Sequence, residues 1–285
     1  MARTVDPTYN QRLTADRPTT RYSHEQNARQ VGEVVKRRGC CSERMVLYSN
    51  QCSPSCGPRS GLAGIISFRV TDGLVSRMAD RLILFIDHQN VYNAAREAFP
   101  HACAGPGSGQ FDPFKLGCLL ASRGRRQREL REVRVYRGLP DSVRDTKSNR
   151  ACLRQTEAQL LAGGGKVIVV SRPVRYPSDW PKTPAREKGI DVALAVDFVQ
   201  LAMARQYDVG VVMSTDTDLR PALETVLGLR SEGGPACEVA AWARPGCHSP
   251  RLSIPGAKIW CHWLDEADYL SVADPTDYSR EPGFA

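Results

Sequence analysis

The stretch RLILFIDHQN, residues 81–90 of this 285-residue chain, joins a continuous apolar run to a polar end. Such a run is typical of a strand that is buried on both faces, as in parallel sheets covered by helices. The run ends at Asp87, and a helical pattern begins three residues later. We therefore predict a buried parallel strand over residues 82–87 whose carboxyl end carries an acidic side chain.

The alternation of apolar runs and helical patterns continues to the end of the chain. Further strands are predicted over residues 133–137, 167–171, 209–214, 237–242 and 259–263. Helices are predicted over residues 90–99, 113–122, 147–161, 190–205 and 219–229, with a final short helix after the last strand. Because strand–helix alternation builds parallel sheets through crossovers, we expect an α/β three-layer sandwich around a mainly parallel, doubly wound sheet.

The first 77 residues differ in composition from the rest. Polar and turn-forming residues dominate them, as in SNQCSPSCGPRSG at 49–61. We predict that residues 1–77 are a disordered tail, or an upstream extension that is not translated in the natural protein and precedes a true start at Met78. The folded domain is predicted over residues 78–272, and a C-terminal tail over residues 273–285.

Composition excludes several classes of protein. No apolar run reaches the ~18 residues of a membrane span, and the first residues lack an apolar signal segment. The ten cysteines show no C-x2-C pair of the kind that marks strong zinc sites, so reduced thiols are expected. We predict a cytoplasmic protein without a membrane partner and leave open whether it forms a homo-oligomer.

Charge is distributed unevenly along the predicted domain. Residues 115–188 hold 18 basic and 7 acidic side chains, whereas residues 191–285 hold 7 basic and 14 acidic ones. This asymmetry suits a polyanion held beside carboxylates that bind a cation. Solvated surface charge is the alternative interpretation.

Four aspartates are expected to converge at one edge of the sheet. Asp87 ends the first strand, Asp216 and Asp218 follow the fourth, and Asp191 lies in the first turn of the preceding helix. Ligands of parallel sheets bind at the carboxyl ends of the strands, where the strand order reverses. Taken singly, each acid has an ordinary role as a helix cap or first-turn residue. Taken together they need a compensating cation, and oxygen ligands suit Mg²⁺ or Mn²⁺.

Three blocks carry these acids in a fixed order: FIDHQNVYN (85–93), EKGIDVALAVD (187–197) and MSTDTDLRPAL (213–223). In order and spacing they resemble the NYN-domain family, a branch of the PIN-like ribonucleases, over about residues 81–269. The resemblance implies a PIN-like sandwich and metal-dependent cleavage of RNA, expected to be single-stranded. It makes Asp87, Asp191, Asp216 and Asp218 the catalytic and metal-binding acids.

The resemblance has two departures and suggests contacts to the substrate. His88 replaces the usual Gly, which puts the width of the pocket in doubt, and Leu219 replaces the usual Phe. The candidate substrate-binding residues are Asn90, from the resemblance, and Lys188, Ser214, Arg144 and Lys147, from their places in the sequence. For Lys188, pairing with a nearby acid is an equal alternative.

Other residues receive more ordinary predictions. Asp197 lies ~9 Å further along the helix than Asp191 and ~120° around it, so we interpret it either as a structural acid or as one that supports the metal-binding acids from behind. Trp242, Trp260 and Trp263 are expected in the core. A basic cluster is expected to contact phosphates of the same substrate, and it consists of Arg123, Arg125, Arg126 and Arg128.

The leading interpretation is a metal-dependent ribonuclease that hydrolyses phosphodiester bonds at the aspartate cluster. The alternative is a non-catalytic RNA-binding or regulatory module of the same fold, with a cation site too weak or too narrow for turnover. The sequence disfavours two further functions. A dehalogenase-type phosphatase needs a second acid where this chain has Gln89, and dinucleotide binding needs a G-x-G-x-x-G motif after the first strand.

Overall fold

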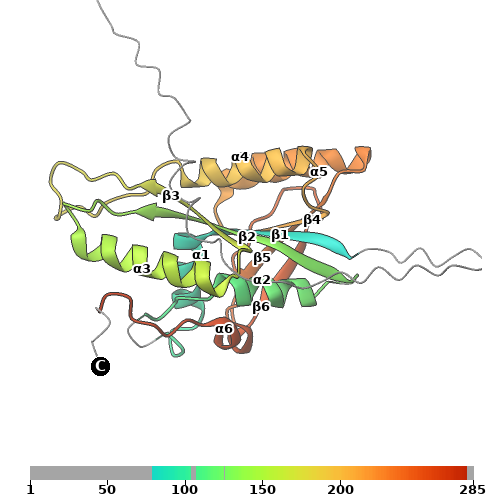
Figure 1. Ribbon diagram of the computed structural model, residues 1–285. Coiled ribbons are helices and arrows are strands. Elements are labelled where there is room, and N and C mark those ends of the chain that lie inside the picture. The colour runs from blue at the N-terminus through green and yellow to red at the C-terminus, as the bar shows by residue number, and fades with distance from the viewer. Residues whose placement is uncertain (1–78, 104–106, 125, 281–285) are drawn as a thin grey trace, which may run out of the picture. The chain divides into compact units, whose positions relative to one another are not determined.

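A six-stranded sheet forms the centre of the domain (Figure 1). The structure is a computed structural model that describes residues 79–103, 107–124 and 126–280. The strands are β1 (Asp80–Asp87), β2 (Arg128–Leu139), β3 (Val167–Pro173), β4 (Val209–Met213), β5 (Ala236–Trp242) and β6 (Trp260–Leu264). Every neighbouring pair is parallel, in the order β3-β2-β1-β4-β5-β6. The predicted parallel α/β fold is confirmed.

The strand order reverses between β1 and β4. The chain passes from β1 to β2 and β3 on one side, then crosses to β4 on the other side of β1. In β1 and β4, Leu82 pairs with Val209 and Ile86 pairs with Met213. The residues that follow these two strands are therefore neighbours at the crevice that such a reversal creates.

Helices cover both faces of the sheet (Figure 1). On one face lie α1 (His88–Ala98), α2 (Pro113–Ser122), α3 (Thr146–Ala162) and α6 (Glu266–Val272). On the other lie α4 (Ile190–Met203) and α5 (Arg220–Gly228), with the short 3-10 helices η1 (Thr217–Leu219) and η2 (Leu229–Glu232) at the two ends of α5. Successive residues of β1 point to opposite faces, so Leu84 packs with α1 and α2, whereas Phe85 packs with α4 and α5. The result is the expected three-layer sandwich.

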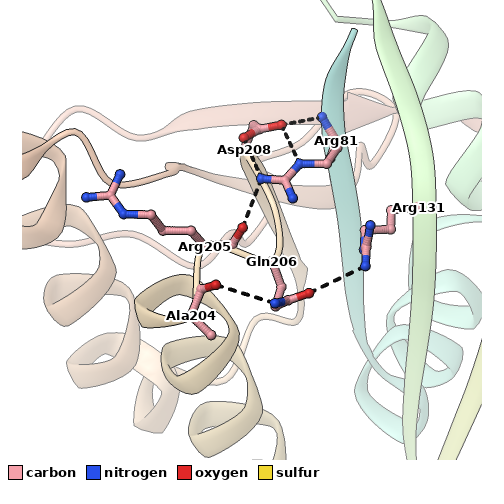
Figure 2. A network of polar contacts seen from close by, with 6 residues as sticks. All are labelled: Arg81, Arg131, Ala204, Arg205, Gln206 and Asp208. Carbon is pink, nitrogen blue, oxygen red and sulfur yellow. Dashed lines mark hydrogen bonds and ion pairs between the residues drawn. The ribbon is translucent and has the colours of Figure 1, made fainter. Parts of the chain in front are cut away.

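Arg81 and Asp208 fasten the first residues of β1 to those of β4 at the amino edge of the sheet (Figure 2). The guanidinium donates to both carboxylate oxygens, over 2.9 and 3.0 Å, and also to the backbone carbonyl of Arg205 over 2.9 Å. Nearby, Gln206 accepts a hydrogen bond from Arg131 of β2. The pair is partly exposed and contributes at most about 1 kcal/mol, so its main effect is to align the two strands.

Some predictions about individual segments differ from the structure. β2 begins at Arg128, five residues before its predicted start, because its polar first half pairs with the beginning of β1. Trp242 is buried as predicted, but the prediction is wrong for Trp260 and Trp263, which are 51% and 41% exposed on the edge strand β6. Asp197 is structural, since it accepts hydrogen bonds from Arg134 and Tyr136.

The predictions for residues 1–77 lie outside the described residues. Within the described part of the chain, no helix is long and apolar enough to cross a membrane. Residues 273–280, predicted as part of a tail, lie against the domain: Ala273 forms a bridge with Phe111, and Arg154 donates to the carbonyl of Tyr278 over 2.9 Å.

Candidate functional site

A cleft of about 350 Å³ opens at the carboxyl edge of the sheet, where the strand order reverses. Its lining is strongly polar, with four carboxylates and three side-chain amides. The lining residues are Asp87, Gln89, Asn90, Asn93, Glu187, Ile190, Asp191 and Asp216. Three segments far apart in the sequence supply the carboxylates, so this acidic surface exists only in the folded sheet.

Asp87 forms the buried end of the cleft. It ends β1, caps the N-terminus of α1 and is only 8% exposed. Its carboxylate accepts hydrogen bonds from the Ser214 hydroxyl over 3.1 Å and from the backbone N–H of Asn90 over 3.3 Å. Burial raises the pKa of Asp87 to about 6 despite these bonds, and the charges of Glu187 and Asp216 add to the rise. The cleft thus favours a proton or a cation beside this carboxylate.

The turn after β4 is tied to α1 through side chains. The Asn90 side-chain oxygen accepts from the backbone N–H of Thr215 over 2.9 Å and from its hydroxyl over 3.1 Å. The Ser214 hydroxyl accepts from the backbone N–H of Asp216 over 3.1 Å. Asp216 in turn caps η1. Asn90 and Ser214, both predicted to bind substrate, therefore hold the acids in place, and Asn90 also lines the cleft.

Asp191 reaches the cleft from the first turn of α4. The residue that precedes this helix, Gly189, has a φ of 72°, a left-handed conformation that glycine adopts without steric cost. The chain can therefore turn sharply into α4, and the half-buried Asp191 faces the rim that Asp87 and Asp216 occupy.

Asp218 is not among the residues that line the cleft. Its side chain is exposed, and its backbone N–H donates to the Asp216 carboxylate over 3.0 Å. In the tight 3-10 turn, the next residue, Leu219, is the one that packs into the core. The structure thus brings together three of the four predicted acids, and the catalytic and metal-binding roles of all four stay predictions.

Glu187 is a cleft residue that the sequence analysis did not select. Its carboxylate accepts from the backbone N–H of Gly138 over 2.5 Å, and burial raises its pKa. A Cβ at Gly138 would lie 2.6 Å from a Glu187 oxygen, so this approach needs glycine. The available signal was its position at the start of the EKGIDVALAVD block, two residues before Gly189.

The donor chemistry of the cleft fits a hard cation such as Mg²⁺ or Mn²⁺. Carboxylate and amide oxygens line it, and the partly protonated, buried Asp87 would gain from a neighbouring positive charge. As they stand, no three His, Cys, Asp or Glu side chains within the described residues lie close enough together to form a metal-binding group. A bound ion would require the carboxylates to draw together.

The predicted basic contacts do not line this cleft. Lys188 is exposed and borders a separate cavity of about 550 Å³. The Arg144 guanidinium lies 5.8 Å from the centre of the Tyr176 ring. Lys147 lines a cavity of about 610 Å³ at the same edge of the sheet.

The basic cluster that begins at Arg123 lies at the opposite edge. Arg123, Arg126 and Arg128 line a cavity of about 660 Å³ together with Asp80, the first residue of β1. Asp80 and Asp87 are about 23 Å apart along an eight-residue strand. The cluster therefore lies at the opposite end of β1 from the acids and outside their cleft, and its contact with phosphates of the same RNA stays a prediction. Arg125 lies outside the described residues.

His88 does not narrow the cleft. Its ring is buried on the α1–α2 face, 5.6 Å from the Phe111 ring centre, and it is not among the cleft residues. Burial lowers the pKa of His88 well below its ordinary range, so the ring is neutral. The doubt about pocket width that this departure raised is removed.

Comparisons with known proteins identify one family for this chain. Residues 81–233, from β1 to the end of the α5 region, match the family model described as NYN domain. A crystal structure of a protein of unknown function from Vibrio parahaemolyticus is similar at 17% sequence identity and a TM-score of 0.42, covering 66% of this chain and 94% of that one. No curated protein matches the chain.

Proposed function

This chain belongs to the NYN domain family of PIN-like ribonucleases, and on that premise we propose that it is a metal-dependent ribonuclease acting at the carboxylate cleft. The observation that carries the proposal is the convergence of Asp87, Glu187, Asp191 and Asp216 on one cleft at the reversal of strand order. Ligands of parallel α/β sheets bind at this position.

We assign the proposed chemistry to the residues as follows. Asp87, Asp191 and Asp216 would hold Mg²⁺ or Mn²⁺, which supplies charge neutralisation at the phosphate and a water of lowered pKa. Ser214 and the N-terminus of α1 fix the Asp87 carboxylate. Glu187, whose pKa burial raises, would accept the proton of the attacking water.

In-line attack of a water on phosphorus would form the new P–O bond and break the bond to the 3′ oxygen, which would take up a proton from solvent. The products are a 5′-phosphate on one fragment and a 3′-hydroxyl on the other. The side-chain amides of Asn93 and Gln89 line the same cleft and can donate hydrogen bonds to phosphate oxygens, which would orient the scissile group.

A non-catalytic RNA-binding module is the second candidate. The spacing of the carboxylates favours it, since no three of the described acidic, histidine or cysteine side chains form a metal-binding group as they stand. The two candidates share the fold and the RNA ligand. They differ in whether bound RNA is cut.

Cleavage of end-labelled single-stranded RNA by the full chain, in Mn²⁺, Mg²⁺ or EDTA, tests the proposal. Asp216→Asn removes one cleft carboxylate, and Asp80→Asn is the matched control at the amino edge. We expect metal-dependent cleavage that is lost in Asp216→Asn and retained in Asp80→Asn. Cleavage that survives in Asp216→Asn contradicts the site, and salt-sensitive binding without cleavage favours the second candidate.

A further inference from the structure

The cavity of about 610 Å³ adjoins the carboxylate cleft. Tyr92 and Asn93 are consecutive on α1, and the first lines the cavity while the second lines the cleft. Gly138 lines the cavity and donates to Glu187, which lines the cleft. The two hollows therefore share a wall at the carboxyl edge of the sheet, and a single extended ligand can occupy both.

Arg137 of β2 is a buried cation in the lining of this cavity. The residue is 9% exposed, and its guanidinium donates to the Gln155 side-chain oxygen over 2.8 Å. Its Nε is buried without a hydrogen-bond partner, and none of the ion pairs found among the described residues includes this guanidinium. Glu187 acts on Arg137 only through its more distant charge. Buried charges are normally paired, so a bound anion would compensate the charge of this guanidinium.

The position of Arg137 is fixed by a short chain of amides. Gln155 is 5% exposed and donates to the Gln110 side-chain oxygen over 2.9 Å, while its own oxygen accepts from Arg137. All three residues line the cavity. The guanidinium is thus oriented before any ligand arrives, which lowers the conformational cost of binding.

The N-terminus of α3 forms another wall. Lys147, Ser148 and Ala151, from the first two turns of this 17-residue helix, line the cavity. The positive end of a helix dipole favours anions such as phosphate, and at this helix the Asp145 carboxylate already accepts from the Ser148 N–H over 3.2 Å. The exposed Lys147 adds a second positive charge at the mouth.

The C-terminal segment contributes a negative charge to the lining of the cavity. Asp277, Tyr278 and Ser279 line the cavity. The Asp277 carboxylate pairs with Arg280 over 3.0 Å and also interacts with the more distant charge of Lys147. An acid at this position competes with an incoming anion for the same cation.

We propose that this cavity is a phosphate-binding subsite for RNA, in which Arg137, Lys147 and the N-terminus of α3 bind one phosphate group while a neighbouring phosphodiester lies in the carboxylate cleft. The inference rests on the proposed function for the identity of the polyanion. The cavity volume of about 610 Å³ is typical of sites that bind small ligands, so the cavity suits a single nucleotide unit rather than a duplex.

Equilibrium binding of a fluorescent single-stranded RNA to the full chain in EDTA, where metal-dependent cleavage is suppressed, tests the subsite. We expect Arg137→Gln to weaken binding by about tenfold, Arg137→Lys to weaken it less, and Asp277→Asn to strengthen it. Arg230→Gln is the charge-matched control, because Arg230 is exposed and lines the amino-edge cavity. Comparing the affinities for RNA with and without a 5′-phosphate shows whether the cavity binds a terminal phosphate or an internal one.

The subsite is overturned if folded Arg137→Gln binds both RNAs as tightly as Arg230→Gln does. Should Arg137→Gln fail to fold, Lys147→Ala and Asp277→Asn decide the question, since both positions are at the surface; binding that neither changes overturns it equally. Cleavage in Mn²⁺ is scored separately. Arg137-dependent binding without any cleavage supports the subsite and contradicts the nuclease.

Discussion

The Ser214 hydroxyl donates a hydrogen bond to the Asp87 carboxylate over 3.1 Å, across the point where the strand order reverses. The bond links the last residue of β1 to the residue after β4, which are adjacent because Ile86 pairs with Met213. The position of this carboxylate therefore follows from the register of the sheet, while the acids opposite it depend on turns and connections.

Asp87→Asn is expected to stabilise the metal-free protein at neutral pH. Burial raises the pKa of Asp87 to about 6, so between its ordinary value and pH 6 the folded state holds a proton that the unfolded state has lost. The ionised carboxylate thus destabilises the fold above pH 6, by up to about 3 kcal/mol, and this cost disappears as the pH falls towards 4. Urea unfolding in EDTA should show the variant more stable at pH 7.5 and no more stable at pH 4. Equal stability at both values would contradict the burial argument.

Glu187→Gln is expected to reduce RNA cleavage by about tenfold or more, because the amide cannot accept a proton. The glutamine oxygen can still accept the Gly138 N–H, and the variant removes a carboxylate whose pKa burial raises, so the thermal midpoint at neutral pH should not fall. Gly138→Ala offers an independent check. Its Cβ would displace the Glu187 carboxylate, so a fall in cleavage is expected there as well. Full activity in both variants would exclude Glu187 from the chemistry.

Manganese is expected to raise the unfolding temperature of the full chain. An ion at 100 times its dissociation constant stabilises a fold by about 2.7 kcal/mol, which corresponds to roughly 5–10 °C for a domain of this size. Asp87→Asn and Asp216→Asn should each lose most of this shift, whereas Asp80→Asn should keep it. A shift that is the same in all four proteins would place the ion elsewhere, and Asp218→Asn shows whether that exposed acid takes part.

Glu238→Ala is expected to destabilise the fold by about 3–5 kcal/mol, because it leaves a buried guanidinium unpaired. Glu238 accepts from Arg128 over 2.7 and 2.9 Å and contacts His262 over 2.7 Å. Burial raises the pKa of Glu238, but these partners outweigh it and the pKa is lowered overall. Its stabilisation is therefore present above the ordinary glutamate value and is lost as the pH falls below it.

Urea unfolding at pH 7 measures the loss of stability in the variant. The difference in the free energy of unfolding between wild type and variant should shrink below pH 4. RNA cleavage per folded molecule should stay unchanged, since Glu238 lines the amino-edge cavity. A variant as stable as wild type at pH 7 would show that the pair contributes nothing.

Hydrophobic pattern was enough to predict the sheet and the edge at which the acids meet. Residues 82–86 and 209–213 are apolar runs, and the acids that follow them must lie at the carboxyl edge once the strands are parallel. The hydrophobic pattern did not predict the first half of β2, where charged side chains surround a single apolar one. In RELRE, at the start of β2, charged residues flank Leu130, and only pairing with β1 makes this segment a strand.

Single residues of the site depend on contacts that sequence spacing does not encode. Asp218 follows Asp216 by two residues, but a 3-10 turn directs it to solvent. Glu187 enters the cleft because Gly138, 49 residues earlier, leaves space for it. Arg137 resembles any other arginine in a basic segment until the fold buries it beside Gln155.

The two walls of the carboxylate cleft differ in how they are anchored. Asp87 ends an interior strand. Glu187 belongs to the connection over residues 174–189, which contains no described helix or strand and in which Arg175 and Arg186 form an isolated β-bridge. Amide protons of interior strands exchange with solvent only on global unfolding, while connections open locally at a much smaller free-energy cost. If RNA binds as proposed, its strand would enter by local opening of this connection, while the Asp87 carboxylate would stay fixed in the slowest-exchanging part of the domain.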